Sequence, residues 1–482
     1  MLASVLLAAP VPAGSAPEKT EPLVVFRTDG YASEPVLVAD PALRVHLLFM
    51  TNQSRTPDPT TPGALMYARL ERGSWTRPRN VLVSPSGGAV SQPAAALDGR
   101  GFLHVVFKAG LFNQIYYSNA HVTEADVAGG WAPTQTLSDQ SSGPGAFGAA
   151  ADVAVGQDGT VHVVYSGRDG NIHYRRSTTG GASWSSPSTV VDTSTTDTAA
   201  DDPRVFVDSQ GRANVTWTQV QRPIGWPPAG IFSSRSGDGG QNWTQPARIA
   251  GPNYSLVTTI AGPNRLLFRT WHSVAGLGED RYQWSSDGGD SWSPAEKLAP
   301  PWRGAGLTGY AAAGFDAAGI VHLVVPSPSP QQGMYYLQSD GTAWSQPAYL
   351  SRGATGDVSL EFPALAIAGG NDLHVVYEED FQRIWYTRRL LNAPGLPPQP
   401  IPAPEPAPVV EPTVPPAPAA IPAGLPQAQP TEQPPAPRIP PAGAPTPASA
   451  AMPGGPLAAG ALSSILLLVA VLVVRRIAVK KP

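Results

Sequence analysis

The 482-residue chain contains no cysteine and only five lysines, against 27 arginines. The absence of cysteine excludes disulfide bonds and any zinc or iron–sulfur centre held by thiolates. The net charge is −4, with 14% charged residues, which has the wrong sign and too small a size for a nucleic-acid-binding surface. The protein must therefore be stabilised by apolar burial, and we expect no nucleic-acid partner.

Several enzyme signatures are also missing. The sequence has no GxxxxGK[ST], HExxH or GxSxG motif, and no GxGxxG motif between a strand and a helix, which excludes the common nucleotide-binding, zincin and α/β-hydrolase sites. Between about residue 20 and residue 390 no long segment shows apolar residues at helical spacing. Short apolar stretches alternate there with Gly-rich turns. This pattern predicts an all-β protein.

The chain is instead rich in an internal repeat. Each copy has an apolar strand, a turn, a second strand such as Val161–Tyr165, a third such as Ile172–Tyr174, and a turn that ends in Trp, here Trp184. Successive copies begin 50 to 60 residues apart, with their first strands aligned at Pro35, Pro93, Val153, Pro203, Leu256, Ala311 and Pro363. Four short strands per unit at this period predict a seven-bladed β-propeller over residues 20–391.

The turns that end in Trp follow the pattern S-x-D-x-G-x-x-W. Two full copies and one shortened copy place at its positions Ser236, Asp238, Gly240, Trp243, Ser285, Asp287, Gly289, Trp292, Asp340 and Trp344. The pattern resembles the Asp-box, or BNR repeat, of sialidase-like propellers. We interpret it as a hairpin staple, because Asp accepts backbone N–H groups, Gly supplies positive φ and Trp covers the turn. Sialidases of this kind have six blades, which is the alternative count.

The two ends of the repeat region fit one another. The seventh copy stops after Arg389 without a fourth strand, and the segment Glu21–Arg27 at the start of the repeats is a spare strand. Pairing them would remove two exposed sheet edges. We therefore predict that this N-terminal strand closes the seventh blade.

The flanking segments predict a membrane-tethered surface protein. Residues 1–17 resemble the end of a signal peptide, and residues 392–456 are a Pro/Ala-rich linker for which a disordered stalk is expected. Residues 457–474 form an apolar run long enough for a transmembrane helix, and the basic tail 475–482 follows. Since basic residues stay in the cytoplasm, the propeller is expected outside the cell on a single-pass anchor. A removable sorting signal is the alternative.

A ligand site is expected on the mouth face, where the loops that enter the first and third strands of each blade converge. The residues predicted to enter the inner strands are Glu34, Gln92, Asp152, Asp202, Ser255, Tyr310 and Phe362. From this ring and its neighbouring loops we select as binding residues Glu34, Asp152, Asp202, Arg222, Trp226 and Tyr310. No cofactor is expected, and Ca²⁺ held by Glu34, Asp152 and Asp202 is the alternative.

The resemblance to sialidases implies three arginines on a carboxylate, a Tyr nucleophile paired with Glu, and an Asp acid/base. The residues that come nearest to this set are Tyr310, Glu361, Arg204, Arg303 and Asp202. The family's Phe-Arg-Ile-Pro-type motif has only Phe26-Arg27-Thr28-Asp29 as a partial match. The predicted mouth ring also presents acids where a sialate site needs arginines.

Five of the eight histidines occupy one repeat position, namely His46, His104, His162, His322 and His374. A shared metal site is excluded by geometry, because different blades hold these side chains too far apart for one ion. We interpret each as a second-strand histidine that is hydrogen-bonded to the next blade.

Three functions remain open from the sequence. The first is a recognition module that binds a cell-surface glycan or protein at the mouth face, which a long stalk favours. The second is an exo-glycosidase that uses mouth-face carboxylates at the separations of retaining or inverting enzymes. The third is a non-catalytic structural scaffold of the cell surface.

Overall fold

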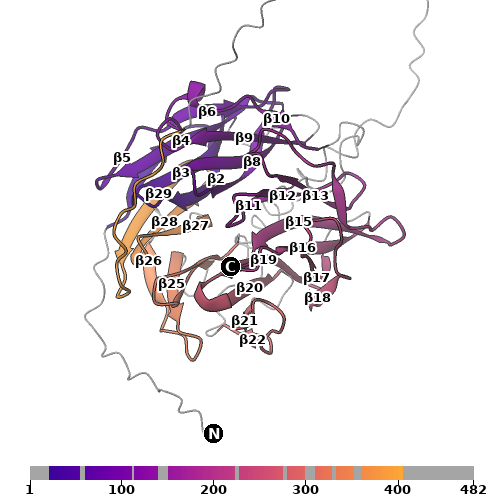
Figure 1. Cartoon of the computed structure of the whole chain (residues 1–482). Helices are drawn as coiled ribbons and strands as arrows, with labels where there is room; N and C mark the ends of the chain where they lie inside the picture. The colour runs from indigo at the N-terminus through magenta and orange to yellow at the C-terminus, as the bar shows by residue number, and fades with distance from the viewer. Residues whose placement is uncertain are drawn as a thin grey trace, which may run out of the picture. The chain divides into compact units, whose positions relative to one another are not determined.

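The computed structural model describes residues 21–54, 60–110, 113–138, 150–222, 227–274, 279–298, 310–327, 333–351 and 360–404. Over these residues the strands form seven antiparallel sheets, arranged as the blades of a propeller (Figure 1). Six of the described sheets have four strands, and blade one has five. The predicted seven-bladed all-β fold is therefore confirmed, and the six-bladed alternative is wrong.

The strands follow the chain from blade to blade. Blade one contains β2 (Tyr31–Ala39), β3 (Val45–Asn52), β4 (Gly63–Glu71), β5 (Ser74–Trp75) and β6 (Arg79–Val83). Blade two contains β7 (Val90–Leu97), β8 (Phe102–Ala109), β9 (Gln114–His121) and β10 (Gln135–Thr136). Blade three contains β11 (Ala151–Val155), β12 (Val161–Ser166), β13 (Ile172–Ser177) and β14 (Ser188–Val191). Blades four and five contain β15 (Thr198–Val207), β16 (Ala213–Gln221), β17 (Pro228–Ser236) and β18 (Ala247–Ala250); and β19 (Tyr254–Ala261), β20 (Leu267–Ser273), β21 (Asp280–Ser285) and β22 (Glu296–Lys297).

Blades six and seven complete the set. They contain β23 (Ala312–Phe315), β24 (Val321–Ser327), β25 (Gly333–Ser339) and β26 (Ala348–Ser351); and β27 (Leu360–Ala368), β28 (Asp372–Glu379), β29 (Arg383–Leu390) and β1 (Leu23–Arg27). Two short 3₁₀ helices, η1 (Ala128–Gly130) and η2 (Pro263–Arg265), lie between strands.

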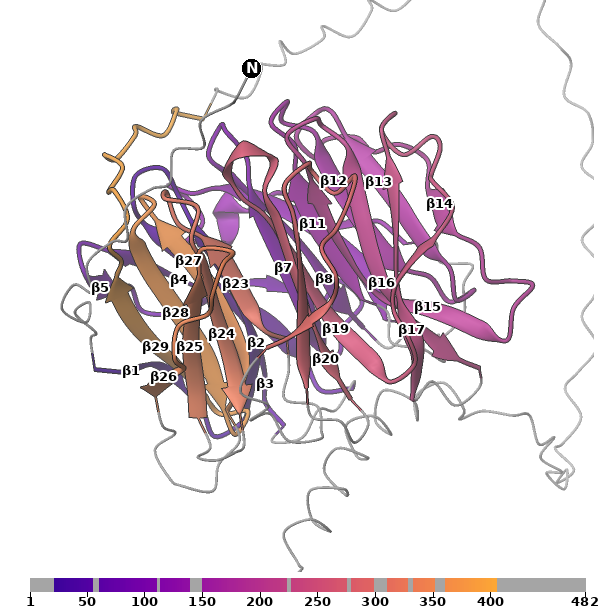
Figure 2. The same ribbon diagram turned by 90° about the horizontal axis from the view of Figure 1, so that it is seen from below.

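The ring of blades is closed. Each inner strand contacts the inner strand of the next blade, in the order β2, β7, β11, β15, β19, β23, β27 and back to β2. β1 pairs antiparallel with β29, with Leu23 opposite Tyr386 and Arg27 opposite Arg383 (Figure 2). The predicted N-terminal strand thus supplies the outer strand of blade seven, as expected.

The hydrophobic core lies between the blades. Among the described residues, buried apolar side chains form seven clusters, and each cluster joins two neighbouring blades. Alternate residues of one strand serve opposite clusters: Val163 of β12 packs towards blade two and Val164 towards blade four. Because successive side chains of a strand point to opposite faces, each sheet needs a neighbour on both sides to bury its apolar residues.

The S-x-D-x-G-x-x-W turns connect third and fourth strands. In blade four the Asp238 carboxylate accepts the backbone N–H groups of Gln241 and Asn242, both at 3.0 Å. Asp287 accepts the N–H of Ser291 at 2.9 Å in the same way. Each carboxylate therefore closes its own turn, which fixes where the following Trp side chain lies.

Several tryptophans that end such turns also join the blades. Trp243 packs edge-on against Tyr174 of the preceding blade, with ring centres 5.2 Å apart. The pairs Trp184–Tyr117 and Trp75–Tyr386 repeat this contact at 4.8 and 5.2 Å. Trp292 instead stacks with Arg269 of its own blade.

The five repeat histidines bond within their own blades, so the expected bond to the next blade is wrong. Nδ1 of His162 lies 2.7 Å from the Tyr174 hydroxyl in the same sheet. The other four make the same contact at 2.6 to 2.8 Å, in the pairs His46–Tyr67, His104–Tyr117, His322–Tyr336 and His374–Tyr386. The reason is register, because His162 lies opposite Arg176 and Tyr174 is two residues along on the same face. The histidine therefore anchors the tyrosine on which the next blade's Trp packs.

The first residues of the Pro-rich linker pack against the propeller. The N–H of Leu396 donates to the Gly369 carbonyl, the N–H of Gln399 donates to the Pro41 carbonyl, and Ile401 packs on the apolar cluster of blades one and two. This segment, drawn in yellow-orange in Figure 1, reaches from blade seven across blade one to blade two. It therefore spans the joint that β1 closes.

The predicted signal segment 1–17, the rest of the linker, the apolar run 457–474 and the basic tail lie outside the described residues. Within the residues that are described, no helix has the length and apolar character needed to cross a membrane.

The closure can be tested by truncating the side chain that fixes β1. Phe26 packs on Phe49 of blade one, with ring centres 4.9 Å apart. Phe26→Ala should lower the free energy of unfolding by about 2 kcal/mol, below the range for a fully buried Phe because Phe26 is half-buried. Leu23→Ala, at a side chain 44% exposed on the same strand, is the control and should change it by less than about 0.5 kcal/mol. Equal effects in urea unfolding would show that β1 does not carry the closure.

Candidate functional site

The inner strands share an irregularity near the mouth face. Register shifts interrupt five of them, and each of these strands has one non-glycine residue with positive φ, at Glu34, Gln92, Asp202, Leu256 and Phe362. A β-bulge re-aims the side chain it contains, and left-handed backbone at such residues is costly. The expected ring position Ser255 is wrong by one residue, since β19 lacks the proline that marks the bulge elsewhere and Leu256 takes the place.

Three predicted site residues meet where the inner strands converge. The Arg204 guanidinium lies over the Tyr310 ring, with Cζ 4.3 Å from the ring centre. Its Nη2 is 3.4 Å from Oδ1 of Asp202. Arg204 is 34% exposed and Asp202 is 22% exposed, so both remain accessible to a ligand. We call the group that surrounds them the central cluster, and it comprises Glu34, Lys108, Asp152, Asp201, Asp202, Arg204 and Tyr310.

Two other predicted residues join neighbouring blades. Oε2 of Glu34 accepts the backbone N–H of Gln92 at 2.5 Å. Oδ2 of Asp152 accepts the N–H of Val205 at 2.9 Å. Each carboxylate therefore uses one oxygen to tie its inner strand to the inner strand of the next blade and keeps the other for further contacts.

The sequence interpretation missed two charged members of the cluster. Asp201 accepts the hydroxyl of Ser166 at 3.0 Å and the N–H of Asp202 at 2.8 Å. Lys108, only 8% exposed, interacts electrostatically with Glu34 and Asp201. A signal was present, because Lys108 is one of only two lysines between residues 20 and 391 and lies in a strand whose other residues, apart from His104, are apolar.

Burial controls the protonation of these groups. Burial and, to a smaller extent, the neighbouring Asp202 carboxylate together raise the pKa of Asp201 to about 7. Burial also raises the pKa values of Glu34, Asp152 and Asp202, against the attraction of Arg204 in each case. The pKa of Lys108 is lowered by burial, with Glu34 and Asp201 opposing the shift. The carboxyl group of Asp201 therefore changes its charge near neutral pH.

Arg222, another predicted residue, lies outside the central cluster. Arg222 donates to the carbonyls of Thr198 and Asp169, at 2.9 and 2.6 Å, and so holds loops of blades three and four together. Trp226 and Arg303 lie outside the described residues. Glu361 lies on β27 in register with Glu378, and its side chain is also outside the described part.

A Tyr–Glu pair does occur on the mouth face, in blade five. The Tyr254 hydroxyl donates to Oε1 of Glu279 at 2.5 Å. Burial opposes the ionisation of Glu279, but hydrogen bonds from Lys297, Tyr254 and Arg281 lower its pKa to about 2. The sequence gives no signal for this pair, because the two partners are 25 residues apart and no local motif links them.

A metal site is not supported by the part of the chain that is described. There, no group of three or more His, Cys, Asp or Glu side chains is placed to hold a metal ion. Glu34 and Asp152 instead point their oxygens at backbone N–H groups. The residues considered for Ca²⁺ therefore do not fit the ion.

Comparisons with known proteins support the propeller fold and give no family. No family model matches the chain, and no curated protein matches it. The BP39L lectin from Burkholderia pseudomallei matches with a TM-score of 0.56 at 12% identity, over 78% of this chain and 99% of that chain. The Hadza microbial sialidase Hz136 matches with a TM-score of 0.45 at 15% identity, over 69% of this chain and 74% of that chain. The NanB sialidase from Streptococcus pneumoniae matches with a TM-score of 0.46 at 12% identity, over 79% of this chain and 71% of that chain. At 12% identity the likeness to the lectin shows the propeller fold.

The raised pKa of Asp201 predicts a pH-dependent stability. In the unfolded chain the pKa of Asp201 is about 3.9, and in the folded chain it is about 7. Between these two pH values the carboxyl group is protonated only in the folded state. The resulting stabilisation is complete below about pH 4 and is lost as the pH rises through 7. Asp201→Asn should therefore raise the free energy of unfolding at pH 8 by roughly 2 kcal/mol and change it little at pH 4.

Asp98→Asn is the control of opposite sign. Burial opposes the ionisation of Asp98, but bonds from His104 and Phe102 lower its pKa to about 2. This variant should be destabilised at pH 7, and the loss should shrink as the pH falls. Urea unfolding from pH 4 to 8 measures both. A destabilised Asp201→Asn protein at pH 8 would contradict the account of its carboxyl group.

Proposed function

We propose that this chain is a carbohydrate-binding propeller whose ligand site is the central cluster on the mouth face. The propeller fold over 78% of the chain, shared with a protein described as a lectin, supports this function. A mouth where loops and inner strands converge is the usual ligand site of such folds.

The observation that carries the proposal is the arrangement of Arg204, Tyr310 and Asp202. Stacking on the Tyr310 ring and contact with Asp202 hold the planar guanidinium in place. A fixed guanidinium offers several parallel donors, and the carboxylate beside it offers acceptors. Neighbouring hydroxyl groups on a sugar ring need donors and acceptors side by side, and this cluster supplies both at a partly exposed position.

The same arrangement weighs against sialidase chemistry. A sialate carboxylate requires guanidinium groups free to form bidentate bonds. Among the described residues of the cluster, Arg204 is the one arginine, and Asp202 already contacts it. The Phe-Arg pair that most resembles the family motif lies on β1, the outer strand of blade seven, where Arg27 is opposite Arg383 of β29.

A glycoside hydrolase is the second candidate, and Asp201 favours it. A carboxyl group whose pKa is raised to about 7 beside a second carboxylate is how glycosidases separate a general acid from its partner. This candidate differs from the first in requiring turnover that depends on Asp201.

The flanking segments support display outside the cell. Residues 457–474 and the basic residues that follow fit a single membrane anchor with a cytoplasmic tail, and the Pro-rich linker would hold the propeller away from the membrane. A glycan on another surface would then be within reach of the mouth.

A glycan array probed with the purified full chain tests the binding function. Arg204→Gln and Asp202→Asn should each weaken the strongest interaction about 10- to 100-fold, since a hydrogen bond to a charged group is worth about 1.5–3 kcal/mol. Arg100→Gln, which alters a side chain 61% exposed in the opposite-face turn of blade two, is the control and should bind as the unmodified chain does. Binding that is equal in all four proteins would contradict the assignment of the mouth.

Fluorogenic glycosides, sialosides included, distinguish the second candidate. We expect no turnover by the full chain. Hydrolysis that disappears in Asp201→Asn, while the variant remains folded, would make the protein a glycosidase.

A further inference from the structure

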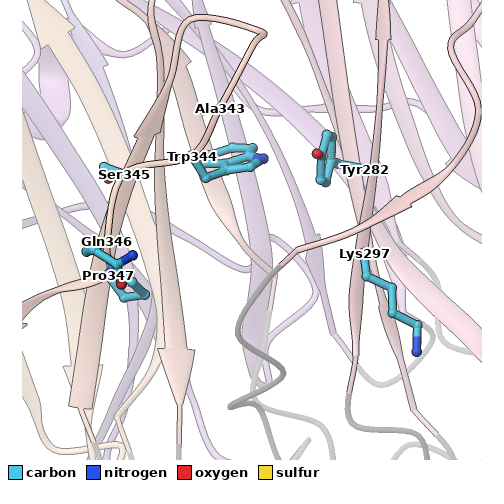
Figure 3. A pocket seen from close by; sticks show the side chains of 7 residues that line it. All are labelled: Tyr282, Lys297, Ala343, Trp344, Ser345, Gln346 and Pro347. Carbon is cyan, nitrogen blue, oxygen red and sulfur yellow. The ribbon is translucent and has the colours of Figure 1, made fainter.

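A cavity lies away from the central cluster, between blades five and six. It has a volume of about 490 Å³ and is lined by Tyr282 and Lys297 from blade five and by Ala343, Trp344, Ser345, Gln346 and Pro347 from blade six. Figure 3 shows Trp344 and Tyr282 together at one end, with Lys297 on one side and Gln346 and Pro347 on the other. The cavity therefore combines an aromatic end with polar groups along both walls.

The shortened turn of blade six makes room for this cavity. Ser339–Trp344 is two residues shorter than the full turns Ser236–Trp243 and Ser285–Trp292. In the full-length turns of blades three and four, a Cβ added to Gly181 or Gly240 would collide with the tyrosine of the preceding blade. Gly341 of the short turn has nothing within 4 Å of the same position. The short turn thus leaves unfilled the space that its equivalents occupy.

A second departure from the repeat frees the tyrosine. Phe268 occupies the second-strand position that histidine holds in five other blades, opposite Trp284 in register. Without a histidine partner, the Tyr282 hydroxyl donates instead to Oε2 of Glu296 at 2.6 Å. This hydrogen bond turns the hydroxyl towards the fourth strand, on the side where the cavity opens.

The charged side chain that lines the cavity is paired. The Lys297 ammonium lies 2.5 Å from Oε2 of Glu279. A carboxylate therefore neutralises the cation in the wall. Trp344 packs edge-on with Tyr282, ring centres 5.4 Å apart, and is held by Phe268 at 5.8 Å, so the indole is rigid.

We propose that this cavity binds a neutral pyranose residue of a glycan. A rigid aromatic side chain suits the C–H face of a sugar ring, and the polar atoms of Tyr282, Gln346 and Lys297 suit its hydroxyl groups. A volume of about 490 Å³ falls within the range of small-molecule sites and accommodates one or two sugar rings. This site is separate from the central cluster and holds or fails independently of the function proposed for the mouth.

The test is saturation-transfer NMR on the full chain with methyl glucoside, galactoside, mannoside and N-acetylglucosaminide at millimolar concentrations. At least one should bind, and Trp344→Ala should weaken it tenfold or more. Trp243→Ala removes the equivalent Trp at the joint of blades three and four, which packs on Tyr174 in the same way. This control should bind normally and lose a similar amount of stability.

Two further variants keep the test independent of folding. Gln346→Ala alters an exposed wall residue and should weaken binding without changing thermal stability. Replacing Ser339–Trp344 by the eight-residue sequence of Ser236–Trp243 restores a long turn of the kind that lies against the tyrosine of the preceding blade. This change should abolish binding by filling the cavity.

The mouth variant Arg204→Gln separates the two sites. Binding that survives Arg204→Gln but not Gln346→Ala supports the cavity. If Arg204→Gln removes binding and the cavity variants do not, the mouth is the only sugar site and the inference is wrong. No binding of any methyl pyranoside would also overturn it, while leaving the glycan array to decide the function of the mouth.

Discussion

The whole architecture depends on closing the ring of blades. Every sheet buries apolar residues on both faces. An open ring would therefore expose the apolar residues on one face of each terminal sheet, together with two strand edges. Pairing of β1 with β29 removes that end, and the segment up to residue 404 crosses the same joint. Closure in turn brings seven inner strands together, and this convergence assembles the central cluster from residues that are far apart in the chain.

Much of the fold could be predicted from the sequence, because each copy of the repeat corresponds to one blade. Aligned prolines located the inner strands, and the missing fourth strand of copy seven pointed to Leu23–Arg27. Two predictions were wrong for the same reason, namely that a residue's position in the repeat does not show where its side chain points. In blade five the bulge lies at Leu256, and Ser255 was predicted instead because no proline marks the bulge in that strand. His162 bonds to Tyr174 within its blade, because register decides which strand a side chain meets.

The site was predicted only in part, since it forms by contact between blades. Arg204, Asp202 and Tyr310 were selected from their places in the repeat, and they do meet. Asp201 was missed, because its importance arises from shared burial, which no local pattern reports. Lys108 was missed although it is one of only two lysines in the repeat region. The cavity at Trp344 arises from what blades five and six lack, a histidine and two turn residues. Departures from a repeat are therefore as informative about function as the repeat itself.

A crystal structure of the full chain with its strongest array glycan would test carbohydrate recognition most directly. The account predicts sugar density at the mouth, with hydroxyl groups within about 3 Å of the Arg204 guanidinium and the Asp202 carboxylate. It also predicts that the bonds from Glu34 and Asp152 to the neighbouring inner strands stay unchanged. A glycan that binds at full occupancy elsewhere and leaves Arg204, Asp202 and Tyr310 in contact with water alone would contradict it.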